Sequence, residues 1–91
     1  MCRNIRRLYN FDPPVSDDEI RAAAMQYVRK VSGSTKPSAA NQEAFDTAVA
    51  TVAAATSELL DSLVTRAPAL DREEFAQRQR ERAQRRRAPS T

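Results

Sequence analysis

Apolar residues recur every three or four positions between residues 16 and 32, which is the spacing of one face of an α-helix. Ser16 and Glu19 have the spacing of a capping box, and Gly33 is placed to end the helix in a left-handed conformation. The pattern therefore predicts a helix over residues 16–32. Its apolar face consists of Ile20, Ala24, Tyr27, Val28 and Val31.

The helical period returns between residues 38 and 64, where either Ser38 or Asn41 is placed to cap the first turn. The short polar connection between the two helices predicts an antiparallel hairpin, so the expected fold class is all-α. The second helix is the longer one, which leaves part of it without a partner. Its predicted core-facing side chains are Phe45, Val49, Val52, Leu59, Leu60 and Leu63.

The two ends of the chain differ from the hairpin. The opening segment carries Ile5, Leu8, Tyr9 and Phe11, and we expect it to pack on the hairpin. A second copy of the chain is the other candidate to cover the longer helix, which predicts a homodimer. We divide the chain into a helical domain, residues 1–69, and an arginine-rich tail, residues 70–91. The tail is polar nearly all round, so we expect it to be partly disordered or helical.

The 91 residues carry a net charge of +3, which hides a pattern along the chain. Residues 1–37 hold seven basic and four acidic side chains, residues 38–71 one and five, and residues 72–91 seven and three. A basic–acidic–basic chain can pair with a second copy through complementary faces, or it can hold a nucleic acid at its basic ends. No apolar run reaches the ~20 residues that span a bilayer, so we expect no membrane partner.

The chain has no histidine and a single cysteine, Cys2, which narrows the catalytic chemistry. A lone cysteine suits a reducing cytoplasm, and we expect neither a metal site nor a cofactor. The arginines at positions 3, 6 and 7 would favour the Cys2 thiolate, so a thiol enzyme is one hypothesis. No base and no oxyanion-hole motif accompany the thiol, which favours a non-catalytic protein.

A polar cluster at the predicted helix–helix loop is the candidate anion site. Arg29, Lys30, Lys36 and Ser38 lie near the start of the second helix, where free backbone N–H groups can hold an anion. Arg3 and Arg6 would complete this site if the opening segment packed back toward the loop. The alternative interpretation is a capped helix–helix turn with solvated bases.

The tail holds the strongest charge feature. Arg78, Arg82, Arg85 and Arg86 would share one face of a helix, an arrangement that can follow the phosphates of a nucleic acid. No aromatic residue lies between these arginines, so base stacking is not supported. The alternative is a solvated tail in a chain that uses thirteen arginines and two lysines.

Four short stretches carry a resemblance to a known family: MCRNI at the start, NFDPP, VRKVSG at the end of the first helix and KPSAAN before the second. Together they resemble a family of short bacterial proteins classified as a domain of unknown function, over residues 1–67. The resemblance implies a small helical bacterial protein and supplies no activity or ligand. We therefore expect a self-associating interaction module, with polyanion binding as the alternative.

Overall fold

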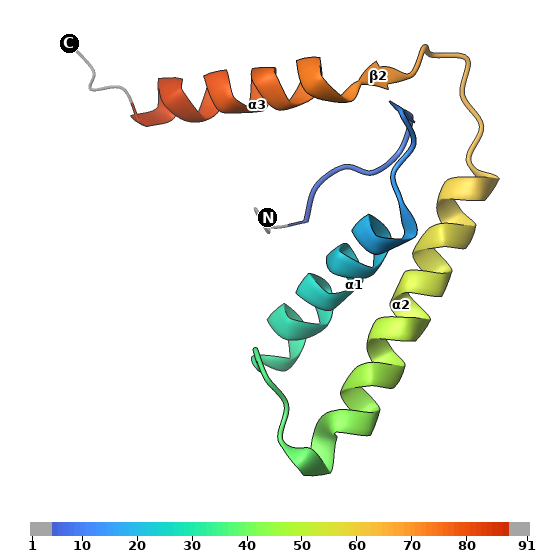
Figure 1. Cartoon of the computed structure of the whole chain (residues 1–91), viewed down its shortest axis with the longest axis vertical. Coiled ribbons are helices and arrows are strands. Elements are labelled where there is room, and N and C mark those ends of the chain that lie inside the picture. The colour runs from blue at the N-terminus through green and yellow to red at the C-terminus, as the bar shows by residue number, and fades with distance from the viewer. Residues whose placement is uncertain (1–4, 88–91) are drawn as a thin grey trace.

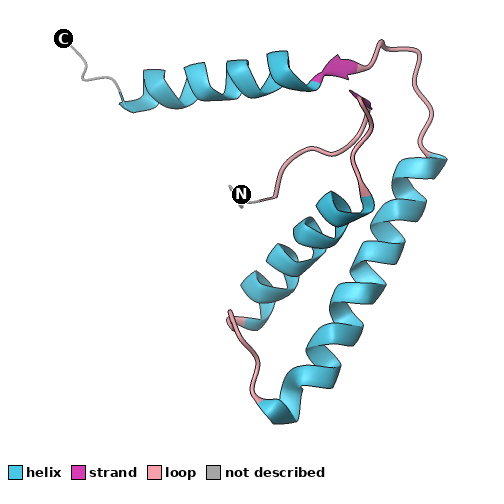
Figure 2. Ribbon diagram, viewed as in Figure 1, coloured by secondary structure: helices cyan, strands magenta, loops and turns pink. Residues whose placement is uncertain are grey.

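The computed structural model describes residues 5–87, in which two antiparallel helices form a hairpin and a third helix projects from one end of it (Figure 1). The all-α prediction is confirmed, with one addition: two very short strands join the opening segment to the third helix (Figure 2). In chain order the elements are β1 (Phe11–Asp12), α1 (Asp17–Ser32), the 3₁₀ turn η1 (Ala39–Asn41), α2 (Gln42–Ser62), β2 (Leu70–Asp71) and α3 (Arg72–Arg87).

Helix α1 has the boundaries that its sequence predicts. The backbone N–H of Glu19 donates to Ser16 Oγ (3.2 Å), and the Ser16 N–H donates to Glu19 Oε1 (3.1 Å), which completes the capping box. At the other end Gly33 has a φ of 68°, the left-handed conformation that a glycine adopts without steric cost. Three carboxylates in the first turn also suit the positive end of the helix dipole.

Helix α2 begins later than predicted and is not capped by a side chain. The single turn η1 precedes it, and the backbone N–H of Asn41 donates to the carbonyl of Ser38 (3.0 Å). Neither the Ser38 nor the Asn41 side chain makes a capping hydrogen bond, so that prediction is wrong. Asn41 has helical backbone angles, whereas a capping residue needs extended ones. The helix ends at Ser62, two residues before the predicted end.

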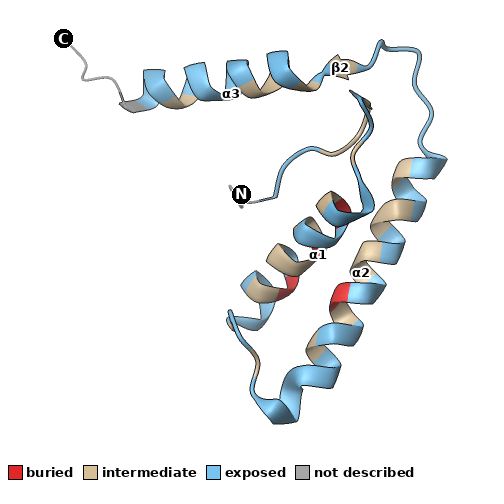
Figure 3. Ribbon diagram, viewed as in Figure 1, coloured by how far each residue is buried: buried red, intermediate tan, exposed pale blue. Residues whose placement is uncertain are grey.

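A small core lies between α1 and α2. Among the described residues the buried apolar side chains are Ile20, Ala24, Val28 and Val49 (Figure 3). The partly buried side chains around this core are Met25, Phe45, Ala48, Val52 and Ala53. Four other predicted core residues are exposed instead, which corrects the prediction: Tyr27 by 47%, Val31 by 66%, Leu59 by 55% and Leu63 by 43%. A single partner helix covers one face of α2 and leaves its flanks open.

The opening segment contacts the start of α3, and we call this contact between residues 10–12 and 68–75 the junction. Strands β1 and β2 pair in parallel, with Phe11 opposite Leu70, and the Leu70 N–H donates to the carbonyl of Asn10 (2.8 Å). The Asn10 side-chain amide donates to the carbonyl of Pro68 (3.2 Å). Asn10 has a φ of 64°, a conformation that asparagine tolerates better than most residues. The opening segment thus packs on the chain, as expected, but through a strand.

Side chains from three elements hold α3 at this junction. The rings of Phe11 and Phe75 meet edge to face with their centroids 5.1 Å apart. Arg72 forms an ion pair with Glu19 of α1, and the Glu74 N–H donates to Asp71 Oδ1 (2.8 Å) as an N-cap. All of these contacts involve residues 71–75, so the rest of α3 extends away from the hairpin (Figure 1).

Acidification is expected to weaken the junction through Glu19. Hydrogen bonding from the Ser16 backbone lowers the pKa of Glu19, Arg72 acts in the same direction, and desolvation opposes them. The unfolded carboxyl, with its ordinary pKa of 4.5, therefore holds its proton more tightly than the folded one. The contribution of the ionised Glu19 carboxylate to folding stability is complete above pH 4.5 and is lost as the pH falls through the lowered pKa. Melting temperatures between pH 7 and 3 should fall more steeply for the natural chain than for Glu19→Gln, and equal slopes would contradict this.

Candidate interaction surfaces

The structure separates the residues of the predicted anion site. Arg29 is half-buried, with an Nε atom that is buried and has no hydrogen-bond partner, whereas Lys30, Lys36 and Ser38 are exposed. Arg6 belongs to the opening segment, which lies at the N-terminal end of α1, opposite the loop that follows Gly33 (Figure 1). Arg3 and Cys2 lie outside the described residues. Binding of an anion by the loop residues stays a prediction.

The arginines of the tail lie together on a helix, as the sequence predicts. Arg78, Arg82, Arg85 and Arg86 are all exposed on α3. Within residues 5–87 none of them forms an ion pair, because the single salt bridge there joins Arg72 to Glu19. The nearby Arg80 donates a hydrogen bond to Gln77 Oε1 (2.7 Å). These four arginines, which we call the basic face of α3, therefore present positive charge to solvent.

An apolar hollow opens on the flank of the hairpin. It has a volume of about 330 Å³ and is lined by Tyr27 of α1 and by four residues of α2, Val52, Ala55, Thr56 and Leu59. The sequence pattern singled out Tyr27, Val52 and Leu59 as core residues. The structure places them at the edge of the core, because α1 packs against the neighbouring face of α2. We call this surface the apolar hollow.

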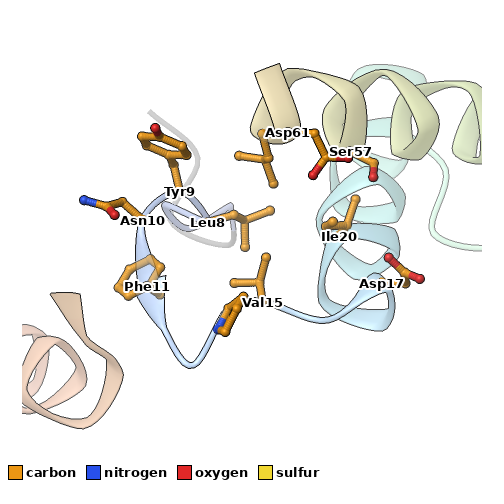
Figure 4. Close-up of a pocket in the computed structure, with 11 residues that line it drawn as sticks. Leu8, Tyr9, Asn10, Phe11, Val15, Asp17, Ile20, Ser57 and Asp61 are labelled. Carbon is orange, nitrogen blue, oxygen red and sulfur yellow. The ribbon is translucent and has the colours of Figure 1, made fainter. Parts of the chain in front are cut away.

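A second cavity lies under the opening segment, where three parts of the chain meet (Figure 4). It has a volume of about 350 Å³, and its apolar lining includes Leu8, Val15, Ile20 and Leu60. Asp17, Ser57 and Asp61 lie on one side of the cavity, and Tyr9 and Asn10 lie on the opposite side (Figure 4). No local sequence pattern reveals this cavity, because its walls are far apart along the chain.

Two further classes of site find no support in the structure. Among residues 5–87 there is no group of three or more histidine, cysteine, aspartate or glutamate side chains that could hold a metal ion. No helix of this part of the chain combines the length and the apolar character that crossing a bilayer requires. The surfaces that stand out are therefore the apolar hollow, the cavity under the opening segment and the basic face of α3.

Comparison with known proteins agrees with the resemblance seen in the sequence. The chain matches the family described as "Uncharacterized conserved protein (DUF2277)" over residues 1–78. The matched region includes the hairpin, the junction and the first turns of α3, and it ends at Arg78, the first of the four arginines on the basic face. Comparisons with curated proteins and with solved structures gave no match. The chain belongs to the DUF2277 family of uncharacterized conserved proteins.

Proposed function

We propose that this protein is a non-catalytic interaction module that self-associates through the apolar hollow. The observation that carries the proposal is the exposure of large apolar side chains on one flank of α2. Leu59 is 55% exposed and lines the hollow, and Leu63 and Val64, which follow the end of α2, are exposed by 43% and 92%. Apolar side chains grouped around a hollow mark an interaction site more often than scattered exposed residues do.

The shape of a single copy supports the same proposal. The radius of gyration is 16.2 Å, whereas a compact domain of this length would have about 12 Å. The shortest dimension is only 17 Å, against 50 and 39 Å for the other two. Few side chains can be fully buried in so thin a molecule. A second copy packed on the hollow would enlarge the core without any change of fold.

Substitution of Leu59 tests the proposal. Leu59→Glu should convert a dimer into a monomer in native mass spectrometry or light scattering, because the charge would have to be buried in the interface. Ser62→Glu is the matched control, since it adds the same charge to an exposed position in the last turn of α2. A dimer that persists in Leu59→Glu, or a natural chain that is monomeric at ~100 µM, where contacts with a micromolar Kd would be populated, would overturn the proposal.

Binding of a nucleic acid or another polyanion is the second candidate function. The exposed arginines on α3 favour it, because they form no ion pair in the described part of the chain. Counterion release would make such binding weaken steeply as salt is added. A labelled single-stranded oligonucleotide titrated at several salt concentrations gives the dependence of the Kd on salt directly.

We also propose a cytoplasmic location, which the single cysteine supports.

A further inference from the structure

We propose that α3 of one copy docks along the acidic face of α2 in a second copy, so that two copies exchange their C-terminal helices. The inference rests on the self-association proposed above and adds a second contact to it. It assigns a partner to the four exposed arginines of α3, which form no ion pair within residues 5–87 of one copy. The occupant of the acidic face is thus a defined segment, residues 72–87 of another copy of this chain.

The charges of the two helices are equal and opposite. Helix α2 carries four carboxylates, Glu43, Asp46, Glu58 and Asp61, and it has no lysine or arginine, so its net charge is −4. Helix α3 carries seven arginines and three glutamates, so its net charge is +4. All four carboxylates of α2 are exposed. Complementary potentials of this kind steer association and fix the register of two surfaces.

The acidic face of α2 also has a shape that a helix can approach. Glu43 and Glu58 lie on the side of α2 turned away from α1, and Asp61, nearly in line with them along the helix, borders the cavity under the opening segment. Between them this stripe of the helix carries only small exposed side chains, Thr47, Ala50 and Ala54. Small side chains allow a short distance between helix axes. The carboxylates at the two ends of the stripe are ~22–27 Å apart along the axis, comparable to the ~24 Å length of α3.

Within the described residues of one copy, the charged side chains of α2 and α3 do not form ion pairs with one another. Helix α3 leaves the hairpin at the junction and extends away from α2 (Figure 1). Its close backbone contacts are with β2, the strand that precedes it. The one salt bridge of residues 5–87 joins Arg72, in the first turn of α3, to Glu19 of α1. Within residues 5–87 the carboxylates of α2 form no ion pair, and neither do Arg78, Arg82, Arg85 and Arg86 of α3, so these charges can meet those of another copy.

A second copy explains these charges better than a polyanion does. A nucleic acid bound along α3 would pair with the arginines, but it would leave the four carboxylates of α2 without a positively charged partner. When each copy docks its α3 on the α2 of the other, the carboxylates of α2 and the arginines of α3 both gain partners of opposite charge. In a symmetric dimer this contact forms twice. The apolar hollow lies on a different flank of α2, so both contacts can form in the same dimer.

Two charge-reversed variants test the exchange. In the first, Arg78→Glu, Arg82→Glu and Arg85→Glu change α3 from net +4 to net −2. In the second, Glu43→Lys, Glu58→Lys and Asp61→Lys change α2 from net −4 to net +2. Each variant alone should dimerise at least ~10-fold more weakly than the natural chain, since like charges then face each other. A control variant reverses three exposed bases outside α3: Arg21, Lys30 and Lys36.

Mixing the two variants gives the decisive result. In a mixed dimer each α3 meets an α2 of opposite charge, so an equimolar mixture should form a heterodimer with a Kd within ~3-fold of the natural value. Circular dichroism checks that each variant is helical. If the natural chain dimerises but the mixture of variants does not form the heterodimer, the docking of α3 on α2 is overturned, while association through the apolar hollow stands. A monomeric natural chain that binds the oligonucleotide overturns both proposals.

Discussion

Replacing Val49 by aspartate is expected to unfold the whole protein at room temperature. Val49 is 1% exposed and lies between α1 and α2 together with Ala24 and Val28. The side chains that surround Val49 in this core are apolar, so the carboxylate would be buried among them at a cost of several kcal/mol. Small domains are stabilised by only about 5–15 kcal/mol. The helical signal in circular dichroism should therefore fall to that of an unfolded chain.

The neighbouring residue supplies the control for this substitution. Ala50 is exposed on the same turn of α2, so Ala50→Asp introduces the same side chain without burying it. Its melting temperature should stay within a few degrees of the natural value, because exposed substitutions change stability by about 0.5 kcal/mol or less. A Val49→Asp protein that melts like Ala50→Asp would show that the hairpin is not held by this core.

Replacing Phe75 by alanine should release α3 while the hairpin stays folded. Phe75 is the one large apolar residue of α3, and its ring packs edge to face on Phe11. An isolated polar helix of 16 residues is marginal in water, so α3 depends on this attachment. Hydrogen exchange measured at ~0.5 M salt, which screens contacts between exposed charges, should show loss of protection in residues 76–87 and unchanged protection around Val28 and Val49.

Gln79→Ala serves as the comparison for Phe75→Ala, because Gln79 is exposed and alanine favours helix. Protection of α3 should be retained in that variant. If Phe75→Ala kept α3 protected to the same degree, the β1–β2 pairing and the Arg72–Glu19 ion pair would suffice to hold the helix. Loss of protection throughout α1 and α2 would instead mean that the hairpin needs the junction.

The hairpin could be predicted from the sequence because its signals are local. Ser16 and Glu19 lie one turn apart, and Gly33 ends α1 by its own backbone conformation. The start of α2 could not be predicted, because Ser38 precedes a 3₁₀ turn that ends at Asn41 and neither of these side chains makes a capping hydrogen bond. Periodicity identified Leu59 and Leu63 as apolar positions. It could not show that a helix as short as α1 would leave them exposed.

The junction could not be predicted, because its partners are almost 60 residues apart in the sequence. Strands of two residues carry no alternating pattern, so Phe11 and Leu70 give no strand signal of their own. The Asn10 side chain donates hydrogen bonds to two backbone carbonyls, and a carbonyl of any segment could have accepted them. The placement of the tail arginines on a helix could be anticipated, since it needs only a helical period. Arg6 does not join the loop residues of the predicted anion site, because the opening segment and Lys36 lie at opposite ends of α1.

The parallel pairing of β1 with β2 also constrains the order in which the chain folds. If Phe11 and Leu70 met in an unfolded chain, the contact would close a loop of nearly 60 residues for a ladder two residues long. Once α1 and α2 have paired, residues 16 and 63 are held at the same end of the hairpin, and only two short connections remain to be ordered (Figure 1). The hairpin therefore acts as a template for the strands. The strands should form last in folding and separate first in unfolding.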